Sequence, residues 1–269
     1  FNNKSIFLTG GTGTFGTNFI NFLLKKYKVK RLVVFSRDEW KQSQLQEIYS
    51  KDKYKNLRFF LGDIRDYSRL QKAMEGIDTV IHAAALKQVP AAEYNPYEFI
   101  KTNIIGTQNL IEISLEKNIE KFISLSTDKA SSPSNLYGAT KLCSDRLVCS
   151  ANNHKGTKRT LFSVVRYGNV LGSRGSVVPL FFRQKKKNQP LTITSKDMTR
   201  FNTLIDEAIA IIILAHKNMY GGEIFVQKTK SYRLYDLAKF INKGKSIKVI
   251  GIRPGEKLHE EMISISDSY

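Results

Sequence analysis

The sequence has 269 residues, of which 41% are hydrophobic and 11% aromatic, enough for one large globular domain with an added lobe. The net charge is +19, but the lysines are spread along the chain without interleaved aromatic residues, so we expect no nucleic-acid partner. No apolar run is long enough to predict a membrane span. Cys143 and Cys149 cannot form a metal site by themselves and indicate reduced thiols, hence a cytoplasmic protein. Because the chain begins with Phe1 rather than Met, we expect it to be part of a longer one.

The first predicted element is a buried strand, Lys4–Thr9, which leads into a glycine loop and then a helical pattern. The spacing Gly-x-Gly-x-x-Gly in this context is typical of a dinucleotide site, where backbone amides and the helix N-terminus attract the pyrophosphate. The candidate contacts in this loop are Gly10, Thr12, Gly13, Thr14, Phe15 and Gly16.

The second predicted strand, Arg31–Phe35, ends in Ser36, Arg37 and Asp38. NAD enzymes often carry an acidic residue at this strand end, whereas the guanidinium of Arg37 suits a phosphate. Ser36, Arg37 and Lys41 therefore predict NADP rather than NAD. Asp38 could instead cap the helix that follows.

Two more strands are predicted at 57–61 and 78–82. Asp63 is a candidate contact for the adenine of the cofactor or, equally, a turn residue. His82 is interpreted as a strand-end residue rather than a catalyst. The small residues after the fourth strand let the backbone lie against a cofactor. The candidate cofactor contacts of this region are Asp63, Ile64, Ala83, Ala84, Ala85 and Lys87, the last also on the substrate side.

A helix is predicted from about Tyr94 to Lys117, with Asn103 near its middle and Gly106 behind it. An Asn and a Gly in this arrangement indicate a local bulge. Asn103 could shape a proton path to a catalytic tyrosine, or it could be a plain polar position.

The fifth predicted strand, Lys121–Leu125, delivers Ser126 to Lys129, and a break at Pro133 and Asn135 precedes the next helix. Tyr137 and Lys141 then lie four apart, on one helix face. An ammonium beside a phenol favours the phenolate, so this tyrosine could accept a proton near neutral pH. A tyrosine and a lysine four residues apart are common on exposed helices. This pair, however, follows the carboxyl end of a predicted parallel strand, where ligands bind in such sheets.

The alternation of strands and helices predicts an α/β fold, a doubly wound parallel sheet with a smaller C-terminal substrate lobe. We predict a dinucleotide domain at 1–168, to which 201–226 returns, and a lobe formed by 169–200 and 227–269. Later elements are a sixth strand at 162–167, a polar loop at 168–176, strands at 191–194 and 223–226, and a helix at 203–218. Arg174, Arg200 and Arg253 are expected to face a diphosphate.

Long motifs then carry a family resemblance. In chain order they are Thr9–Gly16, Ser36–Glu39, Gly62–Asp66, His82–Lys87, Ser126–Ala130, Tyr137–Lys141, Arg166–Val170 and Arg253–Lys257. With these motifs the chain resembles the configuration-inverting UDP-N-acetylglucosamine 4,6-dehydratases, which are extended short-chain dehydrogenase/reductases of the pseudaminic acid pathway. The resemblance implies tightly bound NADP, UDP-N-acetylglucosamine as substrate, products for glycans such as those of flagellin, and a homo-oligomer.

The resemblance also implies roles for individual residues. Tyr137, supported by Lys141 and Thr127, would deprotonate the hydroxyl on sugar carbon 4, Lys129 would remove the hydrogen on carbon 5, and Asp128 would protonate the departing hydroxyl. The implied substrate contacts are Lys87, Asn169, Arg174, Val177, Thr194, Arg200, Arg253 and Glu256.

Two alternatives stay open. A UDP-sugar epimerase on the same scaffold would need the Tyr137/Lys141 pair but not Asp128 and Lys129, and an NADP-sensing regulatory protein would need neither. Gln88 and Asn202 depart from the family's usual residues, so the exact sugar is left open.

Overall fold

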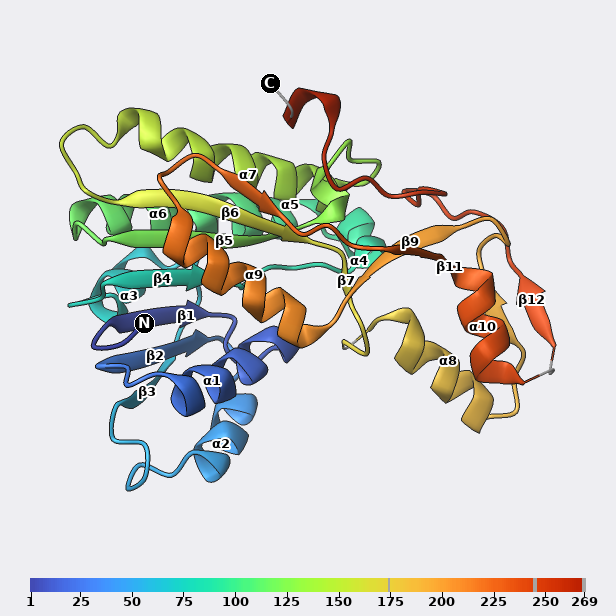
Figure 1. Cartoon of the computed structure of the whole chain (residues 1–269), viewed down its shortest axis with the longest axis horizontal. Helices are drawn as coiled ribbons and strands as arrows, with labels where there is room; N and C mark the ends of the chain where they lie inside the picture. Colours follow the sequence, from blue (N-terminus) through green and yellow to red (C-terminus); the bar gives the residue numbers. More distant parts are fainter. Residues whose placement is uncertain (174, 244–245, 268–269) are drawn as a thin grey trace.

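The computed structural model describes residues 1–173, 175–243 and 246–267. Its centre is a parallel sheet of seven strands (Figure 1). In spatial order the strands are β10 (Ile224–Val226), β6 (Leu161–Tyr167), β5 (Lys121–Thr127), β4 (Thr79–His82), β1 (Ser5–Thr9), β2 (Arg31–Ser36) and β3 (Leu57–Leu61). The order reverses between β1 and β4, so the carboxyl ends of these strands form the crevice in which such sheets bind ligands.

Both faces of the sheet are covered by helices, because its central strands are apolar on both sides. On one face lie α1 (Thr14–Lys26), α2 (Glu39–Ile48) and α9 (Ile205–Asn218). On the other lie α3 (Tyr67–Ala73), α6 (Gly106–Glu116) and α7 (Leu136–His154). The doubly wound fold predicted from the sequence is thus confirmed.

The helix predicted over 94–117 is several pieces. Helix α4 (Val89–Tyr94) ends where Pro96 starts α5 (Pro96–Ile100), since proline can begin a helix but cannot continue one. A π-helical turn, η1 (Lys101–Ile105), then leads into α6. Because the π turn contains Asn103, the predicted bulge is confirmed.

A smaller lobe stands beside the sheet and has its own core around Phe181 and Ile241 (Figure 1). Its elements are β7 (Asn169–Val170), α8 (Val177–Lys186), β8 (Leu191–Ile193), β9 (Thr199–Thr203), β11 (Ser231–Arg233), α10 (Leu234–Asn242) and β12 (Ile247–Val249). Of these, β7, β9, β11, α8, α10 and β12 were not predicted. Thr203, expected to start α9, ends β9 instead.

The C-terminal segment, residues 251–267, runs from the lobe back to α7 and β6 and ends in η3 (Ile265–Asp267) (Figure 1). It is fastened there by Arg166 of β6, whose side chain is fully buried. The Arg166 guanidinium donates to Asp145 of α7 at 3.1 Å and to Asp267 at 2.7 Å. This cluster joins a strand, the helix that carries Tyr137, and the C-terminal segment.

We predict that Arg166→Met lowers the free energy of unfolding by about 3–5 kcal/mol, because it leaves buried carboxylates without their counter-charge. Urea unfolding followed by circular dichroism measures this. The matched control is Arg159→Met, at the exposed approach to β6, which should cost less than about 0.5 kcal/mol. Equal losses in the two variants would contradict the assigned role of the cluster.

Candidate active site

The glycine loop after β1 is shaped for close approach of a ligand. Gly10 has a φ of +66°, and a Cβ placed there would lie 2.8 Å from backbone atoms of Ala83 and Ala84. Gly13 is the N-cap of α1 and has no side chain to bond the first amides of that helix. The amides at the start of a helix and the positive end of its dipole suit the pyrophosphate of a dinucleotide. The loop that contains Thr12, Thr14, Phe15 and Gly16 therefore fits the predicted cofactor.

At the end of β2, Arg37 presents a half-exposed guanidinium 3.4 Å from the Asp63 carboxylate. Asp38 caps α2 by accepting from the Lys41 amide at 3.0 Å, so the capping interpretation is confirmed. The Lys41 ammonium also pairs with Asp38, while Ser36 is held by Gln42.

Asp63 does belong to a turn, since it accepts from the amide of Arg65 at 2.9 Å. Burial opposes its ionised form, but the hydrogen bonds from Arg65 and the charge of Arg37 hold the pKa of Asp63 below its ordinary value. Next to it, Ile64 is buried and packs against Gly106.

The loop after β4 is held in place by buried polar groups. Thr9 accepts from the amides of Ala83 and Ala84 at 3.1 Å each, and Ala85 follows on the exposed side. His82 is bonded on both ring nitrogens, and burial lowers its pKa to about 3, which agrees with a structural role.

Asn103 of the π turn joins this loop to α7. Its amide nitrogen donates to the carbonyl of Leu86 at 2.9 Å and to the Thr140 hydroxyl at 3.0 Å. Its oxygen accepts from the Leu86 amide at 2.9 Å. We infer that the π turn places Asn103 between the loop after β4 and helix α7, and that its hydrogen bonds keep this loop and α7 at a fixed separation.

The end of β5 brings the predicted acid and base together. Asp128 is fully buried and accepts from the Thr127 hydroxyl at 2.9 Å and from the Lys129 ammonium at 3.0 Å. Lys129 also donates to Asn169 of β7 at 3.2 Å. Desolvation and then repulsion by Lys129 lower the pKa of Lys87, which belongs to the loop after β4. Lys129 thus contacts Asp128 at the end of the sheet strand and Asn169 of the lobe.

Tyr137 and Lys141 are both buried on α7. The expectation that Lys141 eases ionisation of the tyrosine is wrong for this structure: burial, and then the negative Asp128, raise the pKa of Tyr137. Lys141 donates to the carbonyl of Leu125 at 2.8 Å, and burial lowers its own pKa. A hydrogen bond with Thr127 partly offsets the effect on Tyr137.

Several predicted substrate residues gather on the lobe. Glu256 accepts from the Thr194 hydroxyl at 3.1 Å and pairs with the Arg253 guanidinium. Arg200 instead donates to the carbonyls of Thr199 and Leu258, at 2.7 and 3.2 Å. Val177 begins α8, and Arg174 lies outside the described residues.

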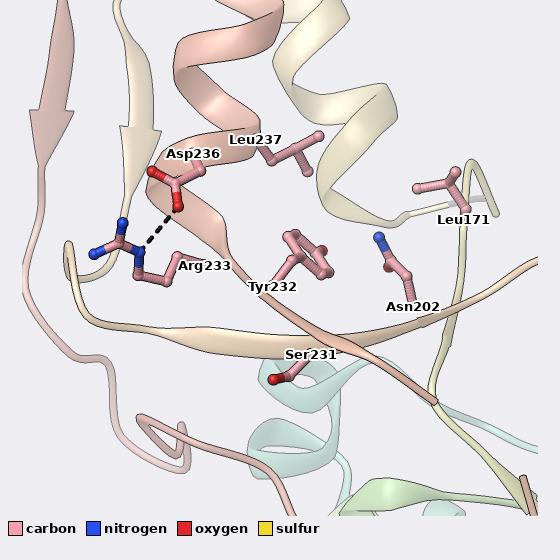
Figure 2. A pocket seen from close by; sticks show the side chains of 7 residues that line it. All are labelled: Leu171, Asn202, Ser231, Tyr232, Arg233, Asp236 and Leu237. Atoms are coloured by element: carbon pink, nitrogen blue, oxygen red, sulfur yellow. Dashed lines mark hydrogen bonds and ion pairs between the residues drawn. The ribbon is translucent and has the colours of Figure 1, made fainter. Parts of the chain in front are cut away.

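A cavity of about 590 Å³ in the lobe has a separate lining (Figure 2). Asn202 faces it and hydrogen-bonds Tyr232, while Arg233 and Asp236 form an ion pair beside it. Its lining contains neither Lys129 nor Tyr137. Asn202 is, however, the register partner on β9 of Asn169 on β7, which accepts from Lys129.

Sequence reasoning missed three charged residues near the site: Asp145, Arg166 and Glu260. The Glu260 carboxylate lies 3.7 Å from the Lys129 ammonium, although the two are far apart in the chain. No local pattern distinguishes it from its neighbours His259 and Glu261.

Within the described ranges, no group of three histidine, cysteine or acidic side chains is placed to hold a metal ion. None of the helices described there is both long and apolar enough for a bilayer.

A parallel sheet with a glycine loop after β1 and a buried Tyr-x-x-x-Lys after β5 defines an extended short-chain dehydrogenase/reductase. Comparison with known proteins agrees. The model of the polysaccharide biosynthesis protein family matches residues 6–269, and this chain belongs to that family.

An inverting UDP-N-acetylglucosamine 4,6-dehydratase of Campylobacter jejuni (strain 81-176) is 50% identical over 272 residues, covering 100% of this chain and 80% of the relative. A UDP-glucose 4-epimerase of Rickettsia bellii is 40% identical over 271 residues, covering 98% and 79%. The solved structure of Pen from Bacillus thuringiensis aligns with a TM-score of 0.93 at 44% identity, covering 97% and 84%. The family resemblance noted from the motifs is thus confirmed.

We predict that Gly10→Ala weakens dinucleotide binding and destabilises the fold more than Gly156→Ala does. Both positions have positive φ, which costs alanine about 1–2 kcal/mol. Only Gly10 adds a clash with the backbone of Ala83, for which we expect a further loss of about 1–3 kcal/mol. Thermal unfolding and calorimetric titration with the dinucleotide measure both effects. Equal behaviour of the two variants would remove the close-approach argument.

Proposed function

We propose that this protein is a nucleotide-sugar 4,6-dehydratase, a hydro-lyase that converts UDP-N-acetylglucosamine with inversion at carbon 5 into a 2-acetamido-2,6-dideoxy-hexos-4-ulose. The observation that carries the proposal is the ion pair of the fully buried Asp128 with the partly buried Lys129, at the end of β5 beside Thr127 and Tyr137. Its support from relatives is the 50% identity to a dehydratase of that name.

The pair already has the composition that elimination of water needs. The Lys129 ammonium donates to Asp128 Oδ1 at 3.0 Å, and in the proposed scheme transfer of that proton from nitrogen to oxygen creates a neutral amine beside a carboxylic acid. The amine can then take the hydrogen of carbon 5, and the acid can protonate the departing hydroxyl of carbon 6. Exclusion of water around Asp128, which is fully buried, strengthens both roles.

In this scheme Tyr137 accepts the proton of the carbon 4 hydroxyl as a phenolate, so its own proton must leave first. Burial and Asp128 oppose this ionisation by raising its pKa, and the hydrogen bond with Thr127 favours it. A nicotinamide dinucleotide would supply the chemistry of taking hydride from carbon 4 and returning it to carbon 6. Nucleotide-sugar enzymes of the same fold have been solved with NAD. The glycine loop would hold its pyrophosphate and Arg37 a ribose phosphate, so we propose NADP for this chain.

The wider setting is proposed from the family alone. We propose a cytoplasmic homo-oligomer whose product enters pseudaminic acid and then surface glycans such as those of flagellin.

A 4-epimerase is the second candidate, favoured by the 40% identity to a UDP-glucose 4-epimerase. An epimerase needs a tyrosine, a lysine and a hydroxyl residue but has no use for an acid–base pair at Asp128 and Lys129. A regulatory NADP sensor would have no use for the buried Tyr137 and Lys141.

The test is incubation with UDP-N-acetylglucosamine, with NMR detection of a methyl group at carbon 6. We predict that Tyr137→Phe abolishes the first oxidation, Lys129→Met allows oxidation but blocks exchange of the carbon 5 hydrogen with deuterated solvent, and Asp128→Asn allows both while slowing loss of water. Each loss should be about 10²–10⁴-fold.

The matched control for these variants is Lys30→Met, an exposed lysine at the opposite end of the sheet, which should behave as wild type. Formation of a carbon 4 epimer without a methyl group would favour the epimerase. Deuterium entering carbon 5 at the normal rate in Lys129→Met would show that another group is the base.

We predict that Arg37→Ala weakens NADP binding by about 1–3 kcal/mol, through loss of a charged hydrogen bond, while NAD binding stays nearly unchanged. Calorimetric titration of cofactor-stripped protein with each dinucleotide measures this. Arg159→Ala, with the same loss of charge far from the loop, is the control. Equal losses for both dinucleotides would argue against NADP selection by Arg37.

A further inference from the structure

A second carboxylate reaches the Lys129 amine from the C-terminal segment. The Glu260 side chain is only 5% exposed, and its Oε1 lies 3.7 Å from Lys129 Nζ. Its Oε2 lies 3.7 Å from the ammonium of Lys257 and has no hydrogen-bond donor among the described residues. A buried carboxylate with an unused acceptor is costly, so its place beside a predicted catalytic base calls for a functional explanation.

The segment that carries Glu260 is fixed to the loop after β5 on both sides of that residue. Lys257 Nζ donates to the carbonyl of Ser131 at 2.7 Å, and Glu261 accepts from the Ser132 hydroxyl at 2.9 Å. The loop begins directly after the η2 turn (Asp128–Ala130), which contains Lys129. Two hydrogen bonds made by side chains therefore hold the segment of Glu260 against the loop that follows Lys129.

Lys129 faces the carboxylates of Asp128 and Glu260, the amide oxygen of Asn169, and the positive charge of Lys87. Glu260 faces the ammonium groups of Lys129 and Lys257. In the proposed reaction Asp128 gives its proton to the leaving hydroxyl, whereas Glu260 is given no proton-transfer role.

We propose that Glu260 is a positioning residue for Lys129: it holds the amine between the sheet and the lobe and stabilises the positive charge that the amine acquires when it takes the carbon 5 hydrogen. This inference rests on the proposed function for the identity of the reaction. The contact itself concerns the protonation of Lys129 and can be measured without any sugar.

The first experiment measures that protonation directly. Reductive methylation of the intact protein is run over a pH series, and the labelled fraction of Lys129 is read by peptide mass spectrometry. Removal of a negative neighbour favours the neutral amine, so Glu260→Gln should move the midpoint of Lys129 labelling to lower pH by roughly one unit. Glu260→Asp should stay near wild type. Glu47→Gln, with the same loss of charge at an exposed position of α2, should leave the midpoint unchanged.

The second experiment follows the reaction with UDP-N-acetylglucosamine. In Glu260→Gln, appearance of reduced-cofactor absorbance should keep its rate, and exchange at carbon 5 should slow by about tenfold or more, with the acid limb of its pH profile moved to lower pH. An unmoved labelling midpoint, or slower exchange with an unmoved acid limb, would overturn the inference and leave Glu260 a structural residue. A moved midpoint in a protein whose wild type forms no methyl product would support the contact and refute the proposed function.

Discussion

A buried guanidinium is the constraint on which the arrangement of the site depends. Arg166 cannot be removed from water without counter-charges, and the structure supplies Asp145 from α7 and Asp267 from the C-terminal segment. Burial opposes ionisation of Asp267, but hydrogen bonds from Arg166 and Ser264 hold its pKa below the ordinary value. The helix that presents Tyr137 and the segment that presents Glu260 are therefore fixed to the same side chain.

The site itself lies where three parts of the chain meet. The end of β5 provides Asp128 and Lys129, the lobe provides Asn169, and the C-terminal segment provides Glu260. None of these parts completes the surroundings of the Lys129 amine alone. A change in how the lobe sits against the sheet would therefore alter the surroundings of the Lys129 amine directly.

What could be predicted from the sequence is what depends on near neighbours in the chain. The glycine loop, the Asp38 cap and the π turn at Asn103 each arise from residues within one or two turns, so local patterns indicated them. The prediction that Lys141 eases the ionisation of Tyr137 was wrong, because a four-residue spacing indicates proximity to Lys141 but not the burial that dominates the pKa of Tyr137. The role of Arg166 was missed because its partner Asp267 lies 101 residues further along the chain, and Glu260 because it is still further from Lys129. The lobe's strands of two to five residues carry too little periodicity.

The distance in sequence between Arg166 and Asp267, 101 residues, also has a consequence for synthesis. Strands β1 to β6 leave the ribosome in order, and the sheet can begin to form while the lobe is still being translated. Until Asp267 emerges, Arg166 has only Asp145 as a partner, and Lys129 lacks Glu260. The nascent chain can thus assemble its dinucleotide loop early, but the acid–base centre becomes complete only when the last part of the described chain folds back over the first.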